Sequence, residues 1–369
     1  MPASRSGEAQ VLGLPNERFR IVTPEGQAGF DREVVAALAR RRQALGLPEG
    51  AMVPELNLLA ISGGGENGAF GAGLLNGWTA HGTRPVFDLA TGVSTGALTA
   101  PFAYLGPEWD TALENVYTAI TPDRVLRRRS VTAAIFNDAL ADTAPLFDTI
   151  SRYLDERMLA AIAQGHQQGR LLLIGTADID AQTPVIWNIG AIAGSGHPRA
   201  LDTVRRILLA SAAIPGAFPP VMFDVTLDGE RHQEMHVDGG TFAQAFLYPS
   251  VVTSARRAAL ARRQRVPPAR AWLIRNGRLD SEWATVERRG ISIAARAISS
   301  MIAASGFNDA VRIYFFAQRD GVDFNLAYIS PDFTMRLQSP FEPGFMRALY
   351  DYGHDRARRG FEWAKTPPL

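Results

Sequence analysis

Cysteine is absent from this sequence of 369 residues, and lysine is almost absent. Without a thiol the chain can form no disulfide, use no cysteine nucleophile and offer no thiolate to a metal, but the compartment stays open. Lys365 is the only lysine, so 37 of the 38 basic residues are arginine. Because 37 acidic residues leave a net charge of +1, the arginine bias does not indicate a nucleic-acid-binding surface, and we expect no nucleic-acid partner.

Long apolar runs are also missing. No run reaches the roughly 18 residues that a membrane-spanning helix needs, and the polar start of the chain lacks the apolar core of a signal peptide. We therefore expect a soluble chain; a periplasmic or exported location would require a targeting segment outside this sequence. Apolar residues make up 46% of the chain and no stretch resembles a linker, so we expect an irregular arm over residues 1–28 and a single domain over residues 29–369.

A glycine-rich turn follows the first strong strand pattern. Residues 56–62 form an apolar run, and Gly63, Gly64, Gly65 and Gly68 then open a helical pattern that reaches about Gly82. Backbone N–H groups at the start of a helix have no partner within the helix and favour anionic oxygen. The pattern therefore predicts an oxyanion-binding turn at the carboxyl end of a strand.

A second turn from strand to helix lies 31 positions further on. The strand pattern of residues 87–91 leads into Gly92-Val93-Ser94-Thr95-Gly96, which has the form of a nucleophile elbow. One helix and one strand fit between the two turns, so we expect the turns side by side at the same edge of a parallel sheet. Ser94 is therefore the candidate nucleophile.

These two motifs resemble those of the patatin-like phospholipase family. The resemblance also includes Asp238-Gly239-Gly240 and residues 210–220, which are similar to the family's segment upstream of its catalytic aspartate. The four segments occur in the family's order and cover most of residues 56–240. The resemblance implies a three-layer α/β fold in which helices cover both faces of a mostly parallel central sheet.

The resemblance also implies a site and an activity. Ser94 and Asp238 would form a Ser–Asp dyad, the amides of Gly63, Gly64 and Gly65 would hold the oxyanion, and neither a metal nor a cofactor would be needed. Asn67 stands where many members carry arginine or lysine, so backbone amides are implied rather than a cation at this position. The implied reaction is calcium-independent hydrolysis of lipid or phospholipid esters. Because a carboxylate with a pKa near 3.9 is a weak base, we expect the site to be partly desolvated.

Other functions fit parts of the pattern. An α/β-hydrolase would need a Ser–Asp–His triad with its histidine after the acid, and His354 is the only histidine that follows Asp238. The glycine pattern also matches a dinucleotide-binding turn, for which Asp88 would have to be the ribose ligand although it lies at the start of its strand. A catalytically inactive lipid-binding module is a further alternative.

Several polar residues have a functional and a structural interpretation. Asp178 and Asp180 follow a strand pattern and could form a metal pair, although hydrogen bonding at the strand end is favoured because no third acidic ligand is near in sequence. His236 lies close to Asp238, and we favour a structural role for it. Arginines of the 120s, from Arg124 to Arg129, form a solvated turn or a peripheral membrane contact.

The remaining periodicity completes the predicted fold. It predicts strands over residues 171–177, 185–187 and 271–274, helices over most of residues 101–168, a helix through residues 291–302, and a last helix from Pro343 to about Gly360.

Overall fold

The computed structural model describes residues 3–119, 121–125, 127–128, 141–249 and 253–368. The strands of its main sheet are β1 (Arg18–Phe19), β2 (Leu56–Ile61), β3 (Leu89–Val93), β6 (Leu171–Asp178), β7 (Thr183–Asn188), β8 (Val221–Leu227), β9 (Glu230–Asp238), β10 (Ala269–Arg275) and β11 (Asp323–Tyr328). Two short strands, β4 (Arg127–Arg128) and β5 (Ala141–Asp142), pair separately.

The helices are α1 (Pro24–Ala44), α2 (Gly68–His81), α3 (Thr95–Leu105), α4 (Asp110–Thr118), α6 (Ala144–Tyr153), α7 (Glu156–Gln167), α8 (Ile189–Gly194), α9 (Ala200–Ser211), α10 (Ser254–Ala261), α11 (Gly290–Arg319) and α12 (Pro343–Arg358). Short 3₁₀ turns are η1 (Ala3–Glu8), η2 (Gly65–Asn67), η3 (Pro107–Trp109), η4 (Pro122–Arg124) and η5 (Gly239–Thr241).

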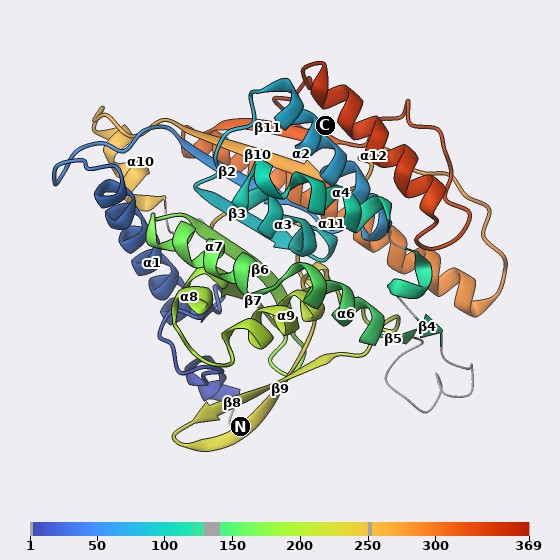
Figure 1. The fold of residues 1–369 in the computed structure, drawn as a ribbon, viewed down its shortest axis with the longest axis horizontal. Helices are drawn as coiled ribbons and strands as arrows, with labels where there is room; N and C mark the ends of the chain where they lie inside the picture. The colour runs from blue at the N-terminus through green and yellow to red at the C-terminus, as the bar shows by residue number, and fades with distance from the viewer. Residues whose placement is uncertain (1–2, 120, 126, 129–140, 250–252, 369) are drawn as a thin grey trace.

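The predicted α/β fold with a mostly parallel central sheet is confirmed. In the described residues the strand order is β1-β7-β6-β3-β2-β10-β11, and the pairs from β6 through β3, β2 and β10 to β11 are parallel. β7 and β1 extend the sheet in antiparallel orientation, and the β8–β9 hairpin joins it through β6. Figure 1 shows this hairpin reaching away from the sheet near the N-terminus.

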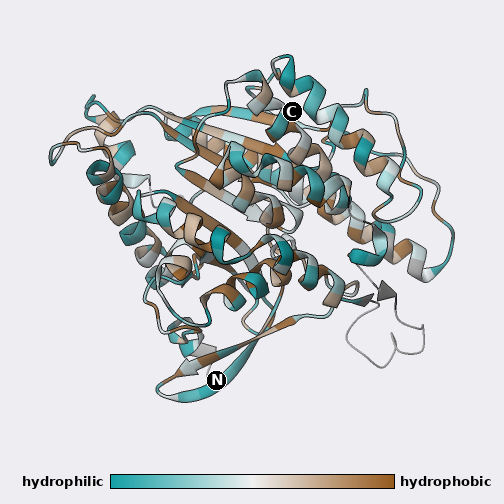
Figure 2. Ribbon diagram, in the orientation of Figure 1, coloured by the Kyte–Doolittle hydropathy of each residue, from teal (hydrophilic) through white to brown (hydrophobic). Residues whose placement is uncertain are grey.

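Helices cover both faces of the sheet, as expected. Alternate strand residues pack in opposite directions: Leu59 and Ile61 belong to one apolar core, and Ala60 between them belongs to the other. The first core also contains residues of α2, α3, α9 and α12, while the second contains residues of α1 and α11. Figure 2 shows the resulting pattern, with apolar strands at the centre.

Helix α2 packs closely against α12, and Figure 1 shows the two side by side. A Cβ atom on Gly73 would lie 2.0 Å from the carbonyl oxygen of Tyr350, so only glycine permits this approach. The small face of α2 thus serves helix–helix contact as well as the sheet.

The first 28 residues are more ordered than the sequence pattern predicts. Helix α1 begins at Pro24, where Thr23 accepts the Gly26 N–H as the N-cap, and β1 pairs with β7. Of the helices expected over residues 101–168, α3, α4, α6 and α7 are present, and residues 129–140 lie outside the described residues. Among the helices that the structure describes, none combines the length and hydropathy that a bilayer crossing requires.

Candidate functional site

Ser94 lies in a sharp turn between β3 and α3. Its backbone has φ 56° and ψ −127°, a region that side chains rarely adopt, and its side chain is buried. This is the backbone geometry expected of a nucleophile elbow, in which the strain of the turn presents the hydroxyl at the strand end.

The register of the sheet brings Asp238 to Ser94. β3 pairs with β6 as far as Val93, opposite Gly175, and the next residue of β6, Thr176, is paired with Asp238 of β9. β9 therefore takes over the edge of β6 where β3 turns away into the elbow. Two residues that are far apart in sequence meet because both strands end against the same strand.

The Ser94 side chain lies close enough to Asp238 to act on its carboxyl group as a hydrogen-bond donor, which lowers the pKa of that group. The Asp238 carboxylate also accepts the Gly240 N–H at 2.7 Å, and only 4% of the residue is exposed. Burial raises the pKa of Asp238 from 3.8 to about 7, although both hydrogen bonds act in the opposite direction. A carboxylate with a pKa near neutrality is a better proton acceptor than the ordinary aspartate considered from the sequence.

The segment of residues 210–220 holds the backbones of both residues. The Ser94 N–H donates to the Ser211 hydroxyl at 3.0 Å, and this hydroxyl donates to the Gly175 carbonyl at 2.6 Å. The Asp238 N–H donates to the Ala213 carbonyl at 2.9 Å. Sequence reasoning included this segment in the resemblance but assigned no role to Ser211, since its partners are set only by the fold.

The glycine loop lies directly beside the elbow. A Cβ atom on Gly63 would be 3.1 Å from the Cβ of Ser94, so the two turns are neighbours, as the spacing predicted. Gly65 has φ 57°, and the space where its Cβ would point is open. The loop therefore presents backbone near the serine without side chains in the way.

The Gly63 amide is not available for the oxyanion-binding role predicted for it. It donates to the carbonyl of Gln244 at 2.9 Å and is not free to hold an oxyanion. The prediction of three donors is therefore corrected to two at most. These are the amides of Gly64 and Gly65, for which no acceptor occurs among the described residues.

Arg275, the last residue of β10, and Asn276, which follows it, support the glycine loop. Arg275 donates to the Gly63 carbonyl at 3.2 Å and to the Ser62 hydroxyl at 3.3 Å, and Asn276 donates through Nδ2 to the Ser62 carbonyl at 2.9 Å. Arg275 is 5% exposed, and burial lowers its pKa to about 10. The sequence could have indicated that Arg275 lies at the end of a strand, because it directly follows a strand pattern. It could not have indicated which groups Arg275 contacts.

Gln244 joins the glycine loop to the aspartate turn. Its carbonyl accepts the Gly63 N–H, and its Nε2 donates to the Gly240 carbonyl at 2.9 Å. Its own N–H donates to Asp309 of α11 at 2.6 Å. Local sequence gives no sign of this residue, because all three partners are distant or depend on the turn.

The residues of the alternative functions lie elsewhere. His354 is on α12, where it stacks on Tyr350 and contacts Asp355, and its carbonyl faces Gly77 of α2. Asp88 accepts the Asn57 N–H at 2.9 Å at the amino end of β3, the edge opposite the glycine loop. In the part of the chain that the structure describes, Ser94 acts on the carboxyl group of Asp238, and His354 makes no hydrogen bond to it.

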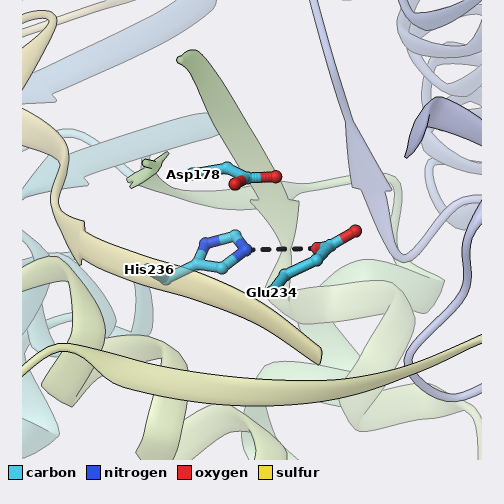
Figure 3. Close-up of side chains that lie close together, drawn as sticks. All are labelled: Asp178, Glu234 and His236. Atoms are coloured by element: carbon cyan, nitrogen blue, oxygen red, sulfur yellow. Dashed lines mark hydrogen bonds and ion pairs between the residues drawn. The ribbon is translucent and has the colours of Figure 1, made fainter. Parts of the chain in front are cut away.

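Three potential metal ligands cluster on β6 and β9. Asp178, Glu234 and His236 each offer a ligand atom within 4.8 Å of the others (Figure 3). The carboxylates are already neutralised, because Arg20 lies 2.7 Å from Asp178 and 3.0 Å from Glu234, and Arg18 also pairs with Glu234.

The charges in this cluster favour an ion-pair network over a metal site. Burial alone would raise the pKa of Glu234, but hydrogen bonds from His236 and Arg18 and the charges of the arginines outweigh it and hold the pKa at about 2. Burial lowers the pKa of His236, whose ring contacts Thr176, Trp187 and Phe223, so its role is structural. Asp178 accepts the Ala181 N–H and Asp180 accepts the Met235 N–H, which confirms hydrogen bonding at the strand end.

Comparisons with known proteins complete the description. Two solved structures are similar to the chain: VipD from Legionella pneumophila, with 10% identity, a TM-score of 0.39 and coverage of 83% of this chain and 66% of that one, and the human GIVD cytosolic phospholipase A2, with 11% identity, a TM-score of 0.32 and coverage of 84% and 52%. The chain thus spans less than two thirds of the length of each. No curated protein sequence matches it.

A family match is more direct, since it covers the segments that build the site. The family described as patatin-like phospholipase matches residues 59–249, which are more than half of the chain and include the glycine loop, the elbow and Asp238. The chain belongs to the patatin-like phospholipase family.

Proposed function

We propose that the protein is a serine acyl hydrolase that cleaves carboxylic esters of lipids through a dyad of Ser94 and Asp238. One observation carries the proposal: the sheet register brings Ser94 within hydrogen-bonding reach of the buried Asp238 carboxylate, whose pKa is raised to about 7. The base is thus largely ionised just above neutral pH and still basic enough to take the hydroxyl proton. Family membership supports a lipid ester as the substrate class.

The reaction runs in two halves. Asp238 takes the proton of Ser94 while Oγ attacks the ester carbonyl carbon; the tetrahedral intermediate then collapses, and the leaving alcohol receives that proton. Water next loses a proton to Asp238 and attacks the acyl carbon, and the fatty acid leaves as the Ser94 hydroxyl is restored. The amides of Gly64 and Gly65 are the proposed donors to the oxyanion, each contributing roughly 3 kcal/mol.

A labelling experiment tests the dyad. Wild type, Ser94→Ala and Asp238→Asn are treated with a fluorophosphonate probe and an aryl ester, and Ser195→Ala serves as a serine control. We expect labelling and turnover in wild type and Ser195→Ala, and neither in Ser94→Ala, with folding checked by circular dichroism. Undiminished ester cleavage by folded Ser94→Ala would overturn the proposal. Loss of activity in His354→Ala would instead favour a triad.

We further propose that the first half of α11 contacts the lipid surface. Ile293, Ile298 and Met301 are 53%, 55% and 71% exposed, although a helix of this composition is normally covered. From Arg288 to Asn308 the sequence carries three arginines and no acidic residue, a combination that suits an anionic bilayer. The arginines of the 120s are a weaker candidate, since Arg124 alone offers a described side chain and Arg129 lies outside the described residues.

The position of α11 favours this contact. Gly306 packs directly on Arg275, which supports the glycine loop, so the helix continues outward from the site. In Figure 1 the start of this orange helix extends past the neighbouring elements at the lower right.

Vesicle binding tests the contact independently of catalysis. In a Ser94→Ala background, Ile298→Asp with Met301→Asp should reduce cosedimentation with phosphatidylglycerol vesicles. Ser299→Asp with Ser300→Asp, at two exposed positions of the same helix, serves as the charge-matched control. Equal loss in both variants would argue against apolar insertion. A changed sedimentation coefficient of the double variant without vesicles would assign the surface to a second copy of the chain.

A further inference from the structure

A cavity lies at the edge of the sheet opposite Ser94. It has a volume of about 360 Å³ and is bounded by α1, α10 and the starts of β2, β3, β6 and β10. Because β3 rises about 3.3 Å per residue over its five residues, this edge is roughly 16 Å from the elbow. The volume is at the lower end of the range for ligand pockets, which suits one acyl chain better than a two-chain lipid.

The wall of the cavity is mostly hydrocarbon. Helix α1 contributes Phe30, Val34 and Leu38, spaced to lie on one helix face, and the strand starts contribute Leu58 and Leu171. An apolar ligand is stabilised against such a wall because its surface and that of the wall leave water. A polar ligand finds few hydrogen-bond partners there.

The polar groups of the wall are mainly cationic. Arg41, Arg42 and Arg256 line it, and Asp88 is the only acidic residue among the described lining residues. Arg256 is fully engaged, since its three nitrogens donate to the carbonyls of Asp320, Pro267 and Gly321.

Arg41 leaves a donor unused. Its Nη2 lies 3.1 Å from Asp88, but its Nε is buried and has no hydrogen-bond partner. A buried donor without an acceptor is costly. A rotation of the partly exposed Arg41 side chain that turned Nε toward an anionic oxygen in the cavity would remove this cost. Arg42 beside it donates only through Nε, to the carbonyl of Ala51, in the bonds that the structure describes.

We propose that this cavity binds a single-chain amphiphile with an anionic head group, of which a free fatty acid is the simplest example. The acyl chain lies between α1 and the strand starts, and the carboxylate meets Arg41 and Arg42. The site is separate from the Ser94–Asp238 site and binds its ligand without chemical change, so it stands whether or not the chain hydrolyses esters.

Photocrosslinking locates the ligand directly. A palmitic acid analogue with a terminal diazirine is irradiated with the full chain, and the labelled peptides are identified by mass spectrometry. We expect label on α1 or α10. Label confined to the peptides of the glycine loop or of Ser94 would overturn the proposal, because it would place the fatty acid at the hydrolytic site.

Two matched pairs of variants fill the cavity from opposite walls. Ala259→Trp on α10 and Val34→Trp on α1 should each reduce labelling by roughly tenfold or more, since the new ring occupies the space of the chain. The neighbouring exposed residues give the controls Ala258→Trp and Val35→Trp, which should retain labelling. Unchanged labelling in both cavity variants would overturn the proposal, and thermal unfolding shows that each variant is folded.

The head group is tested by charge. Arg41→Gln should weaken competition by palmitate but not by palmityl alcohol, whereas Arg262→Gln at the exposed end of α10 should change neither. Equal competition by the acid and the alcohol in wild type would show that no anionic group is recognised. Fluorophosphonate labelling of Ser94 is measured in the same variants. A result against the fatty-acid site can then be distinguished from a result against the proposed hydrolytic site.

Discussion

The two edges of the central sheet are built from the same strands but differ in almost every property. At the carboxyl edge the strands end in glycines and in Ser94 and Asp238, whose backbone N–H groups are held by Ser211 and Ala213. At the amino edge the same strands begin with leucines that surround a cavity with an unused Arg41 donor. The comparison teaches that the two ends of a parallel sheet can serve different purposes. Here the carboxyl ends of the strands position Ser94 and Asp238, and the amino ends border a cavity.

The largest expected effect concerns the carboxyl edge. Asp238→Asn removes the proposed base and should lower kcat for an aryl ester by roughly a hundredfold to ten-thousandfold. In wild type kcat should fall as pH drops through about 7, because protonation of Asp238 removes the base. A pH–rate profile measures this directly. A flat profile between pH 5 and 8 would show that the carboxylate is not the base.

The same substitution should stabilise the protein. The pKa of Asp238 is about 7 in the folded chain and near 3.8 when unfolded, so its ionisation costs stability progressively as pH rises from about 4 to 7. Asp238→Asn should therefore raise the free energy of unfolding at pH 8 by up to about 4 kcal/mol, and by much less near pH 4. Denaturant unfolding at both pH values measures the difference, and a gain that is equal at the two would contradict the assignment.

A smaller effect is expected from the support of the glycine loop. Arg275→Met should lower kcat by roughly tenfold with little change in KM, because the loop loses the donor to the Gly63 carbonyl while the dyad stays intact. Arg275→Lys should recover part of the loss. Arg278→Met is the matched control, since Arg278 pairs with Asp280 at the surface. A change in KM alone would assign Arg275 to substrate binding.

The smallest expected effect concerns whether the two edges of the sheet act independently of each other. Ala259→Trp fills the amino-edge cavity and should leave kcat and KM for a soluble aryl ester unchanged within about twofold, because this edge takes no part in the chemistry. Steady-state kinetics beside Ala258→Trp measures it. A clear loss of kcat in Ala259→Trp alone would show that the two edges are coupled.

Sequence alone predicted the parts of the site that are encoded locally. The glycine loop and the elbow follow from strand patterns and glycine spacing, and the structure places them side by side. The meeting of Ser94 with Asp238 depends on the register of β9 on β6, which no local pattern contains, and was predicted through resemblance. The use of the Gly63 amide by Gln244 joins residues that are far apart in sequence, and so the oxyanion prediction included one amide too many.

The helix through residues 291–302 shows a different limit. Its apolar spacing correctly predicted a helix, but periodicity does not say what covers it. Asp309 near its other end is held by Arg312 and by the amides of Gln244 and Ala245, whereas Ile298 and Met301 are exposed. Partial desolvation of Asp238 was expected because an ordinary carboxylate is a weak base, but the extent to which its pKa is raised could not be predicted, because it depends on burial in the fold.

Arginines from the beginning of the chain pair with the carboxylates of the cluster in Figure 3 and so connect the first 20 residues to β9. Glu234 lies four residues before Asp238 on β9 and forms ion pairs with Arg18 and Arg20. Further along the hairpin, Gln10 is bridged to Thr226 of β8. Removal of these early residues should therefore loosen β9 and shift Asp238, the proposed proton acceptor, relative to Ser94.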